Sequence, residues 1–349
     1  MIDKSTSDNI KTLGVVMTAA IVMYHCGATA SSNAGGGGMV DLWLNDHVSI
    51  AFNQIGVFAM SYFFTVTGFL FFLGLSLGKI PSKIRKRVKT LLIPYVAWEI
   101  IATCYYAAIG RTYSFNAWAS TVFLFNAWPP DGALWYVYAI FLLACCSYVL
   151  LPLLNNGKFG GVAVLVCFFA CYFFCNTSNP AISSIVSYGY LGNVLTYLPA
   201  YVLGAYIGLH FDSKTSMINL CIFLLLTGFI FSAYMGNSIE FVLARCLPSL
   251  TILLFNLPVI KGESTVYKVT FLVYALHQPL LSTLGGAIRN CISYMPSMAL
   301  ANLSFRFVYC LAIFCLAIAL YYLLKRMNAP FITSLLTGGR AERKIKTVE

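Results

Sequence analysis

The sequence predicts an all-α, polytopic membrane protein, for two reasons. Of its 349 residues, 60% carry hydrophobic side chains and only 9% are charged, and the mean hydropathy is +0.81. Such a chain has too few polar groups to cover a water-facing surface. Its apolar residues also gather in segments close to the ~20 residues with which an α-helix crosses a bilayer. A soluble helical protein would have to bury all of these segments, so we favour the membrane class.

About ten apolar segments, separated by polar or Gly- and Pro-bearing breaks, are expected to form one transmembrane domain over residues 1–349. The stretch 116–128, "NAWASTVFLFNAW", is apolar but short, which favours an interfacial or re-entrant piece. The ten segments lie near residues 12–30, 54–77, 90–109, 133–153, 159–176, 193–210, 217–235, 241–258, 268–288 and 305–324.

Lys and Arg predict the orientation of these segments. The runs 79–89, "KIPSKIRKRVK", and 338–346, "GGRAERKIK", both favour the cytoplasm, and an even number of spans places both termini there. Residues 326–349 then form a basic cytoplasmic tail. This arrangement accounts for the net charge of +11 without nucleic acid, for which no binding module is visible. The basic residues that fall elsewhere are Arg111, Arg245, Arg289 and Arg306.

The first segment has a second interpretation. Lys4 and Lys11, the apolar run and the small residues at 28–30 also describe a secretory signal peptide. Its length, nearer to a full span than to a short apolar region, favours a membrane helix. The stretch after it, residues 31–47, is Gly-rich and is expected to be an outer loop in which His47 is solvated.

Apart from His210, which ends the sixth segment on its cytoplasmic side, two histidines fall within predicted spans. His25 lies about 9 Å below the outer boundary of the first segment. Histidine is the side chain best suited to accept a proton near neutral pH, whereas the alternative role is a hydrogen bond to a neighbouring helix. His277 lies near the middle of the ninth segment, where Pro279 predicts a kink and a structural hydrogen bond is favoured.

Other ionisable residues leave more than one role open. Topology alone explains the basic run at 79–89, but Arg85, Arg87 and Lys89 lead into the third segment and would suit a ligand with several phosphates. Glu99 is a buried carboxylate that needs a partner, and Arg245 is a candidate for that pairing. The twelve cysteines contain no CxxC pair, so we expect neither a metal site nor a disulfide framework.

Several segments together resemble the membrane acyltransferase-3 family, whose members move acyl groups from coenzyme A to sugars and other envelope molecules. Each is weak alone, but they follow one another in the family's order over nearly the whole chain. They are "GVFAMSYFFTVTGFLFF" (56–72), "RKRVKTLLIPYVAW" (85–98), "LWYVYAIFL" (134–142), "LTYLPAYVLGAYIG" (195–208) and "VYKVTFLVYALHQPLL" (266–281).

The first segment departs from the family pattern. The family typically has an arginine eleven positions before the helix-1 histidine, and Gly14 stands at that place here. Lys11 is the nearby cation that would substitute for it. The resemblance implies His25 as the catalytic base, with Lys11, Arg85, Arg87 and Lys89 binding the donor. The residues that it implies as lining of the site are Thr67, Glu99, Trp135, Tyr138 and His277.

The resemblance therefore implies a membrane O-acyltransferase, with acetyl-coenzyme A or another acyl-coenzyme A as donor substrate and no permanently bound cofactor. The expected acceptor is a hydroxyl of a cell-envelope glycan or a lipid-linked sugar, and the expected location is the bacterial plasma membrane, with the bilayer as a partner. Two alternatives stay open. A transporter or flippase of a polyprenyl-linked or amphipathic substrate would also place polar groups inside a helical bundle. A catalytically idle membrane partner would tolerate Gly14.

Overall fold

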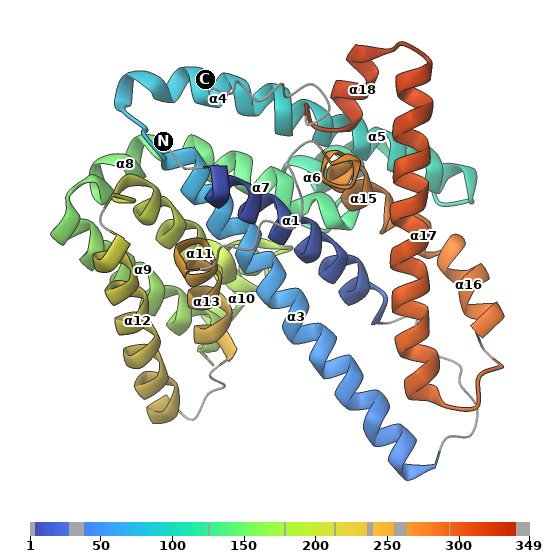
Figure 1. Ribbon diagram of the computed structural model, residues 1–349, viewed down its shortest axis with the longest axis horizontal. Coiled ribbons are helices and arrows are strands. Elements are labelled where there is room, and N and C mark those ends of the chain that lie inside the picture. The colour runs from blue at the N-terminus through green and yellow to red at the C-terminus, as the bar shows by residue number, and fades with distance from the viewer. Residues whose placement is uncertain are drawn as a thin grey trace.

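The structure, a computed structural model, is helical throughout the residues that it describes, which are 4–27, 38–124, 126–177, 179–212, 214–235, 240–254, 264–292 and 294–339 (Figure 1). These ranges contain no β-strand, so the predicted all-α class is confirmed. The first half of the chain forms α1 (Lys4–His25), α3 (Met39–Phe72), α4 (Ile80–Arg87), α5 (Ile93–Ala108), α6 (Phe115–Phe123), α7 (Trp135–Cys145), α8 (Ser147–Asn155) and α9 (Gly157–Asn176). The second half forms α10 (Pro180–Val186), α11 (Leu191–Leu209), α12 (Lys214–Met235), α13 (Glu240–Leu254), α14 (Thr265–Lys268), α15 (Thr270–Leu276), α16 (Leu284–Ile292), α17 (Met298–Arg326) and α18 (Pro330–Leu336).

Within the described residues, every predicted apolar segment overlaps a helix or a bent helix pair, while residues 28–30 and 255–258 of two segments lie outside the described residues. Among the described residues, four helical stretches are long and apolar enough to cross a membrane, and two bent pairs raise that number to six. The stretch 116–128 forms only the nine-residue α6 between 115 and 123, in agreement with a piece too short to span. The number of ten spans stays a prediction. The four stretches are Met39–Phe72, Leu77–Ala108, Gly157–Asn176 and Met298–Arg326.

Helix α3 begins earlier than predicted, because the end of the presumed outer loop is helical from Met39 onward. Its first turn contacts the start of α17. The Asp41 carboxylate accepts hydrogen bonds from the Ser297 hydroxyl and from the backbone N–H groups of Met298 and Ala299. These three donors precede or open α17, where backbone N–H groups lack partners within the helix. His47 is exposed, as predicted, but is a helical residue. The prediction of a loop over 31–47 is therefore wrong for residues 39–47, and its residues 31–37 lie outside the described residues.

Helix α3 runs through the middle of the bundle and crosses α11 at very short range (Figure 1). Three glycines make the crossing. A Cβ atom at Gly68 would collide with the Tyr201 carbonyl oxygen, and Cβ atoms at Gly204 and Gly208 would collide with backbone oxygens of α3. Small residues let helix backbones approach in this way within membranes. The sequence block that ends in Thr67-Gly68-Phe69 thus has a packing reason for its glycine.

Three interruptions shape the helices around α3. Helices α7 and α8 meet at 61°, and α15 meets the segment Pro279–Ile292 at 55°, which confirms the kink predicted from Pro279. The π-helical turn Val88–Leu92, labelled η2, joins α4 to α5. Two short 3₁₀ turns, η3 (Gly132–Leu134) and η4 (Pro279–Leu281), lie at the start of α7 and just after α15.

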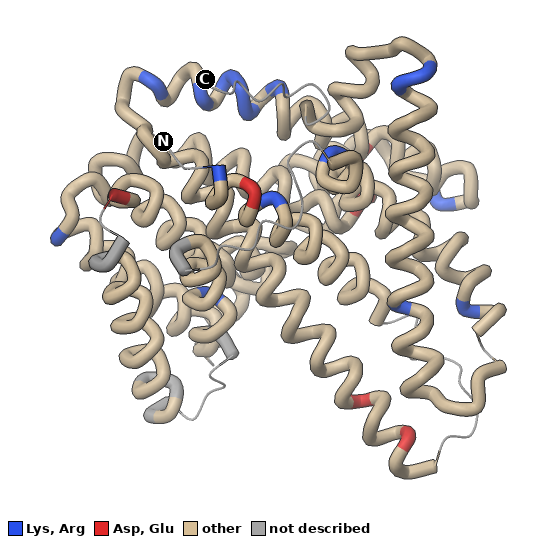
Figure 2. Tube along the Cα trace, in the orientation of Figure 1, with Lys and Arg blue, Asp and Glu red and all other residues tan. Residues whose placement is uncertain are grey.

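Lys and Arg residues gather along one edge of the chain trace, at the top of Figure 2, where α4, the start of α1 and the end of α17 lie. The acidic residues at the far end of α3 are at the opposite side. Helix α18 packs back on α5, with the Trp98 indole N–H donating to the Leu336 carbonyl. The predicted tail therefore begins with an ordered helix, and its basic residues from Arg340 onward lie outside the described residues.

Candidate active site

The centre of the site is a pair of histidines from α1 and the α15 bend. His25 is the last residue of α1, and its Nδ1 lies 3.0 Å from Nε2 of His277. The His277 side chain is fully buried, and its Nδ1 lies 2.7 Å from the Tyr274 carbonyl oxygen. The Tyr309 hydroxyl donates to the His277 carbonyl at 2.5 Å. Hydrogen bonds thus fix both the side chain and the backbone carbonyl of His277, just before the kink predicted at Pro279.

These contacts determine the tautomer of each neutral ring. A carbonyl oxygen only accepts, so Nδ1 of His277 must carry the hydrogen that binds Tyr274. Nε2 of His277 is then an acceptor, and Nδ1 of His25 must be the donor. The remaining nitrogen, Nε2 of His25, is left with a free lone pair. The pair therefore presents a neutral imidazole that is able to take up a proton.

His25 lines a cavity of about 370 Å³, within the range of about 300–1,000 Å³ that is usual for small-molecule sites. Its walls come from the end of α1, the middle of α3, the start of α7 and the first half of α11. Trp135, one of the predicted lining residues, is among them. The polar groups on this wall, besides His25, belong to Tyr24, Asn193, Tyr197 and Gln278, and the aromatic ones include Trp128. We call this space the histidine cavity.

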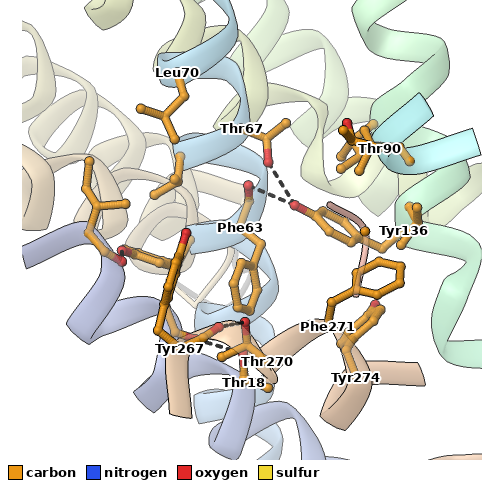
Figure 3. A pocket seen from close by; sticks show the side chains of 18 of the residues that line it. Thr18, Phe63, Thr67, Leu70, Thr90, Tyr136, Tyr267, Thr270, Phe271 and Tyr274 are labelled. Atoms are coloured by element: carbon orange, nitrogen blue, oxygen red, sulfur yellow. Dashed lines mark hydrogen bonds between the residues drawn. The ribbon is translucent and has the colours of Figure 1, made fainter. Parts of the chain in front are cut away.

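A second cavity, of about 160 Å³, shares α1, α3 and α7 with the first and is also lined by residues of α4, α14 and α15 (Figure 3). It is rich in hydroxyl groups, and Arg87 is its cation. The Tyr136 hydroxyl lies 2.9 Å from Oγ1 of Thr67 and donates to the Phe63 carbonyl at 3.0 Å, as Figure 3 shows. Gly14 also lines this space, and a Cβ atom there would meet no heavy atom within 4 Å. We call it the arginine cavity.

The two cavities lie at successive positions along α1 and α3, and both helices line both cavities. On α1 the arginine cavity is lined by Ile10, Gly14 and Thr18, and the histidine cavity by residues 21, 24 and 25. On α3 the order is reversed, with 62–70 at the first cavity and 56–60 at the second. Eleven residues of helix separate Gly14 from His25, or about 16 Å. The arrangement places a cation at one level and a base at the other.

The structure brings some of the predicted donor-binding residues to these cavities but not others. Arg87 is half-buried in the arginine cavity and lies over the Phe71 ring, 5.6 Å from its centroid. Arg85 and Lys89 are exposed, and neither lines a cavity described above. Lys11 Nζ forms an ion pair with Asp8 at 2.9 Å and also lines neither cavity. The donor-binding role of Lys11 has no support in this geometry.

Two further residues that were predicted to line the site, Glu99 and Tyr138, form hydrogen bonds outside the two cavities. Glu99 is fully buried, and its Oε2 accepts the backbone N–H of Asp131 at 3.0 Å. Tyr138 donates to the Phe123 carbonyl and stacks on Tyr95. Neither residue lines the two cavities.

The suggested pairing of Glu99 with Arg245 is wrong. The Arg245 Nε donates to the Thr196 carbonyl, and its guanidinium lies over the Tyr197 ring, 5.2 Å from the centroid. Glu99 belongs to α5, and its Oε2 accepts the N–H of Asp131, the residue directly before η3, while its Oε1 has no partner within the described residues. The two ionisable groups therefore contact different residues and not one another.

Sequence reasoning missed Arg306 and Gln278. Arg306 is fully buried in α17, donates to the Met23 carbonyl and to Oδ1 of Asn302, and lies over the Phe52 ring. In the sequence, Arg306 was one of the four basic residues that the predicted topology did not place on the cytoplasmic side. Gln278 follows His277 directly and lines the histidine cavity. Its position beside a histidine within an apolar segment was the only hint.

Comparison with known proteins supplies one match. A family model described as an acyltransferase domain, Acyl_transf_3, matches residues 9–322. The matched range includes both cavities apart from Gly338, and both histidines. No curated protein and no solved structure matches the chain.

Proposed function

This chain belongs to the acyltransferase-3 family, and we propose that it moves an acetyl or other short acyl group from acyl-coenzyme A to a hydroxyl of a cell-envelope glycan or glycolipid. The family and the apolar helices make it a membrane acyltransferase. The identity of donor and acceptor is the proposal. The observation that carries it is the stacking of a base-bearing cavity on a cation-bearing cavity within one set of helices.

His25 is the proposed general base. An acceptor hydroxyl that attacks a thioester carbonyl must lose its proton, and a positioned neutral imidazole is able to take it. The hydrogen bonds from Tyr274 through His277 to His25 leave Nε2 of His25 free for this step. Proton transfer from the hydroxyl would make His25 a cation, which His277 and the cavity wall would have to tolerate only transiently.

Arg87 is the proposed contact for the charged part of the donor. A guanidinium suits phosphate oxygens because it offers several N–H donors in one plane. Arg87 ends α4, directly before the π-helical turn at the basic edge of the molecule, while the rest of its cavity is formed by hydroxyls and apolar side chains. A long donor held there by its phosphates would extend along α1 toward His25.

The topology that fits this reaction has ten spans, cytoplasmic termini and the basic edge facing the cytoplasm, in a bacterial plasma membrane. Acyl-coenzyme A is made in the cytoplasm and would approach Arg87 from that side. The histidine cavity then faces the opposite side, where an envelope acceptor would enter. Figure 2 supports this orientation, since Lys and Arg gather on one edge.

The test measures thiol release and acyl transfer by the full-length protein. Purified protein in lipid nanodiscs receives acetyl-coenzyme A, and free thiol is followed with a colorimetric reagent. In parallel, membranes that contain the protein receive radiolabelled acetyl-coenzyme A, and the label is followed into glycolipid and polysaccharide fractions. His25→Ala and His25→Gln should lower the rate by about 10²–10⁴-fold, the usual contribution of a general base. Tm and the elution volume verify that the variants are folded.

Each outcome decides one part of the proposal. Wild-type rates in both His25 variants would reject His25 as the base. Absence of thiol release and of label transfer by the wild type would reject acyl-coenzyme A as donor. Label that remains in acetyl-coenzyme A while an amphipathic sugar lipid crosses the bilayer would favour a transporter instead.

A further inference from the structure

Gln278 is a polar residue of the histidine cavity whose side-chain amide forms no hydrogen bond within the described part of the chain. It lies in the bend between α15 and η4, directly after the histidine that binds His25. Its Oε1 is buried and unpartnered, while the residue as a whole is half-buried and lines the cavity. The two N–H groups of the amide are therefore the polar part that a molecule in the cavity would meet.

Gly132 holds this amide in place by its lack of a side chain. A Cβ atom at Gly132 would lie 2.9 Å from Oε1, 3.3 Å from Nε2 and 3.4 Å from Cδ of Gln278. Real Cβ atoms do not approach so closely, so any larger residue would displace the amide. Gly132 itself lines the histidine cavity. The Gln278 amide thus packs against the backbone of η3 at the wall of the histidine cavity.

The loop that carries Gly132 is fixed on both sides. Before it, the backbone N–H of Asp131 binds Glu99, and the Asp131 side chain accepts the N–H of Ala133. After it, the Tyr274 hydroxyl donates to the Ala133 carbonyl at 2.6 Å. Tyr274 also supplies the carbonyl that orients His277. One set of hydrogen bonds therefore positions both the histidine pair and the seat of the Gln278 amide.

We propose that Gln278 is a catalytic residue whose amide N–H stabilises the oxyanion of acyl transfer; this inference rests on the proposed function. The acceptor oxygen forms a bond to the thioester carbon, its proton goes to Nε2 of His25, and the carbonyl electron pair moves to oxygen. Gln278 donates to that oxyanion. The carbonyl then re-forms, the C–S bond breaks, and the departing thiolate takes the proton back from His25. A donor fixed in advance stabilises the charge only while it exists, which lowers the barrier.

The experiment measures kcat and KM for acetyl-coenzyme A, by thiol release from full-length protein in nanodiscs. Gln278→Glu and Gln278→Met keep the length of the side chain but remove the N–H donors. Each should lower kcat by about 10²–10³-fold, the usual effect of losing one oxyanion donor. The KM and the Kd for free coenzyme A should change by less than about twofold, because the contact forms only as the reaction proceeds.

Gly132→Ala tests the same contact from the other side. Its Cβ should displace the amide and lower kcat in the same direction, whereas Gly286→Ala, where a Cβ meets no heavy atom within 4 Å, should leave kcat unchanged. The double variant Gly132→Ala, Gln278→Met should be no slower than Gln278→Met alone. Tm and elution volume identify variants that fail to fold.

The outcomes separate the inference from the proposal on which it rests. An active wild type together with unchanged kcat in Gln278→Glu and Gln278→Met overturns the role of Gln278 and leaves the acyltransferase proposal intact. A raised KM at unchanged kcat also overturns it, since Gln278 would then only bind substrate. A wild type that releases no thiol overturns both.

Discussion

Arg306 of α17 donates a hydrogen bond to the carbonyl of Met23 on α1, two residues before His25. The last carbonyls of a helix lack partners within it, and a cation there is favourable. Oδ1 of Asn302 accepts from Nε of the same guanidinium, and Asn302 in turn binds Asn45 and Ser49 of α3. One buried arginine of α17 therefore links the end of α1 to α17 and, through Asn302, to α3.

Replacing Arg306 should weaken the fold and displace His25. Arg306→Gln would leave the Met23 carbonyl without this donor, at a cost of about 1–3 kcal/mol for a buried unsatisfied group. We expect a lower Tm and a lower kcat together. Arg326→Gln on the exposed end of the same helix is the matched control and should change neither. A wild-type Tm in Arg306→Gln would contradict the structural role.

His277 should matter through the orientation of His25 rather than through substrate. In His277→Phe the His25 ring would lose its hydrogen bond to the α15 bend and keep only the one to the Ile21 carbonyl of its own helix, so its orientation would be less restricted. A misplacement of about 1 Å can reduce a rate by about 10²-fold, so kcat for thiol release should fall by that order while KM stays near the wild-type value. His47→Phe, at an exposed site of α3, is the control. Unchanged kcat in His277→Phe would show that the contact between His25 and His277 is not needed for catalysis.

Arg87 and Arg85 allow a direct test of donor binding. Both belong to α4, but only Arg87 lines the arginine cavity, whereas Arg85 is exposed. Arg87→Gln should raise KM for acetyl-coenzyme A about tenfold or more, since a charge-assisted hydrogen bond contributes about 1.5–3 kcal/mol. Arg85→Gln should leave it unchanged. Equal effects of the two substitutions would indicate a diffuse attraction to the basic edge instead of a site.

Gly68 should be intolerant of a methyl group. Gly68→Ala would push Cβ into the Tyr201 carbonyl of α11, and overpacking of this kind costs about 1–3 kcal/mol. The expected result is a lower Tm in detergent or nanodiscs. Gly14→Ala is the contrast, because its Cβ enters open space within a helix, where alanine is preferred by about 0.5–1 kcal/mol. Equal Tm values for Gly68→Ala and wild type would argue against the close crossing.

The sequence was sufficient for the helical class and for the position of each apolar segment, because spanning length and apolar composition are local properties. It failed at the start of α3, where helix formation depends on contacts between Asp41 and a segment more than 250 residues away. The hydropathy of residues 38–47 does not indicate that Asp41 contacts the start of α17. The kink at Pro279 was predictable, since proline removes a backbone donor from its own position.

The candidate site was predictable only in part. His25 was identifiable because an ionisable residue in an apolar helix is unusual. Its contact with His277 joins residues 252 positions apart, so the sequence offered both histidines but not the pair. The basic run likewise contained Arg87 without distinguishing it from Arg85, because the packing of α4 decides which of its faces meets the bundle, and residues two positions apart on a helix point in nearly opposite directions. Gln278 and Gly132 become candidate site residues only because the fold places them side by side.

The glycine crossing of α3 and α11 limits how this molecule can move. Carriers that alternate their opening swing one group of helices against another, which requires an interface that is free to slide. Here the two backbones touch at three glycines, and a shift by one turn would bring larger side chains into the gap. The two helices should therefore stay together throughout a catalytic cycle. Donor and acceptor would travel to a stationary meeting point, and turnover would be governed by their arrival and departure.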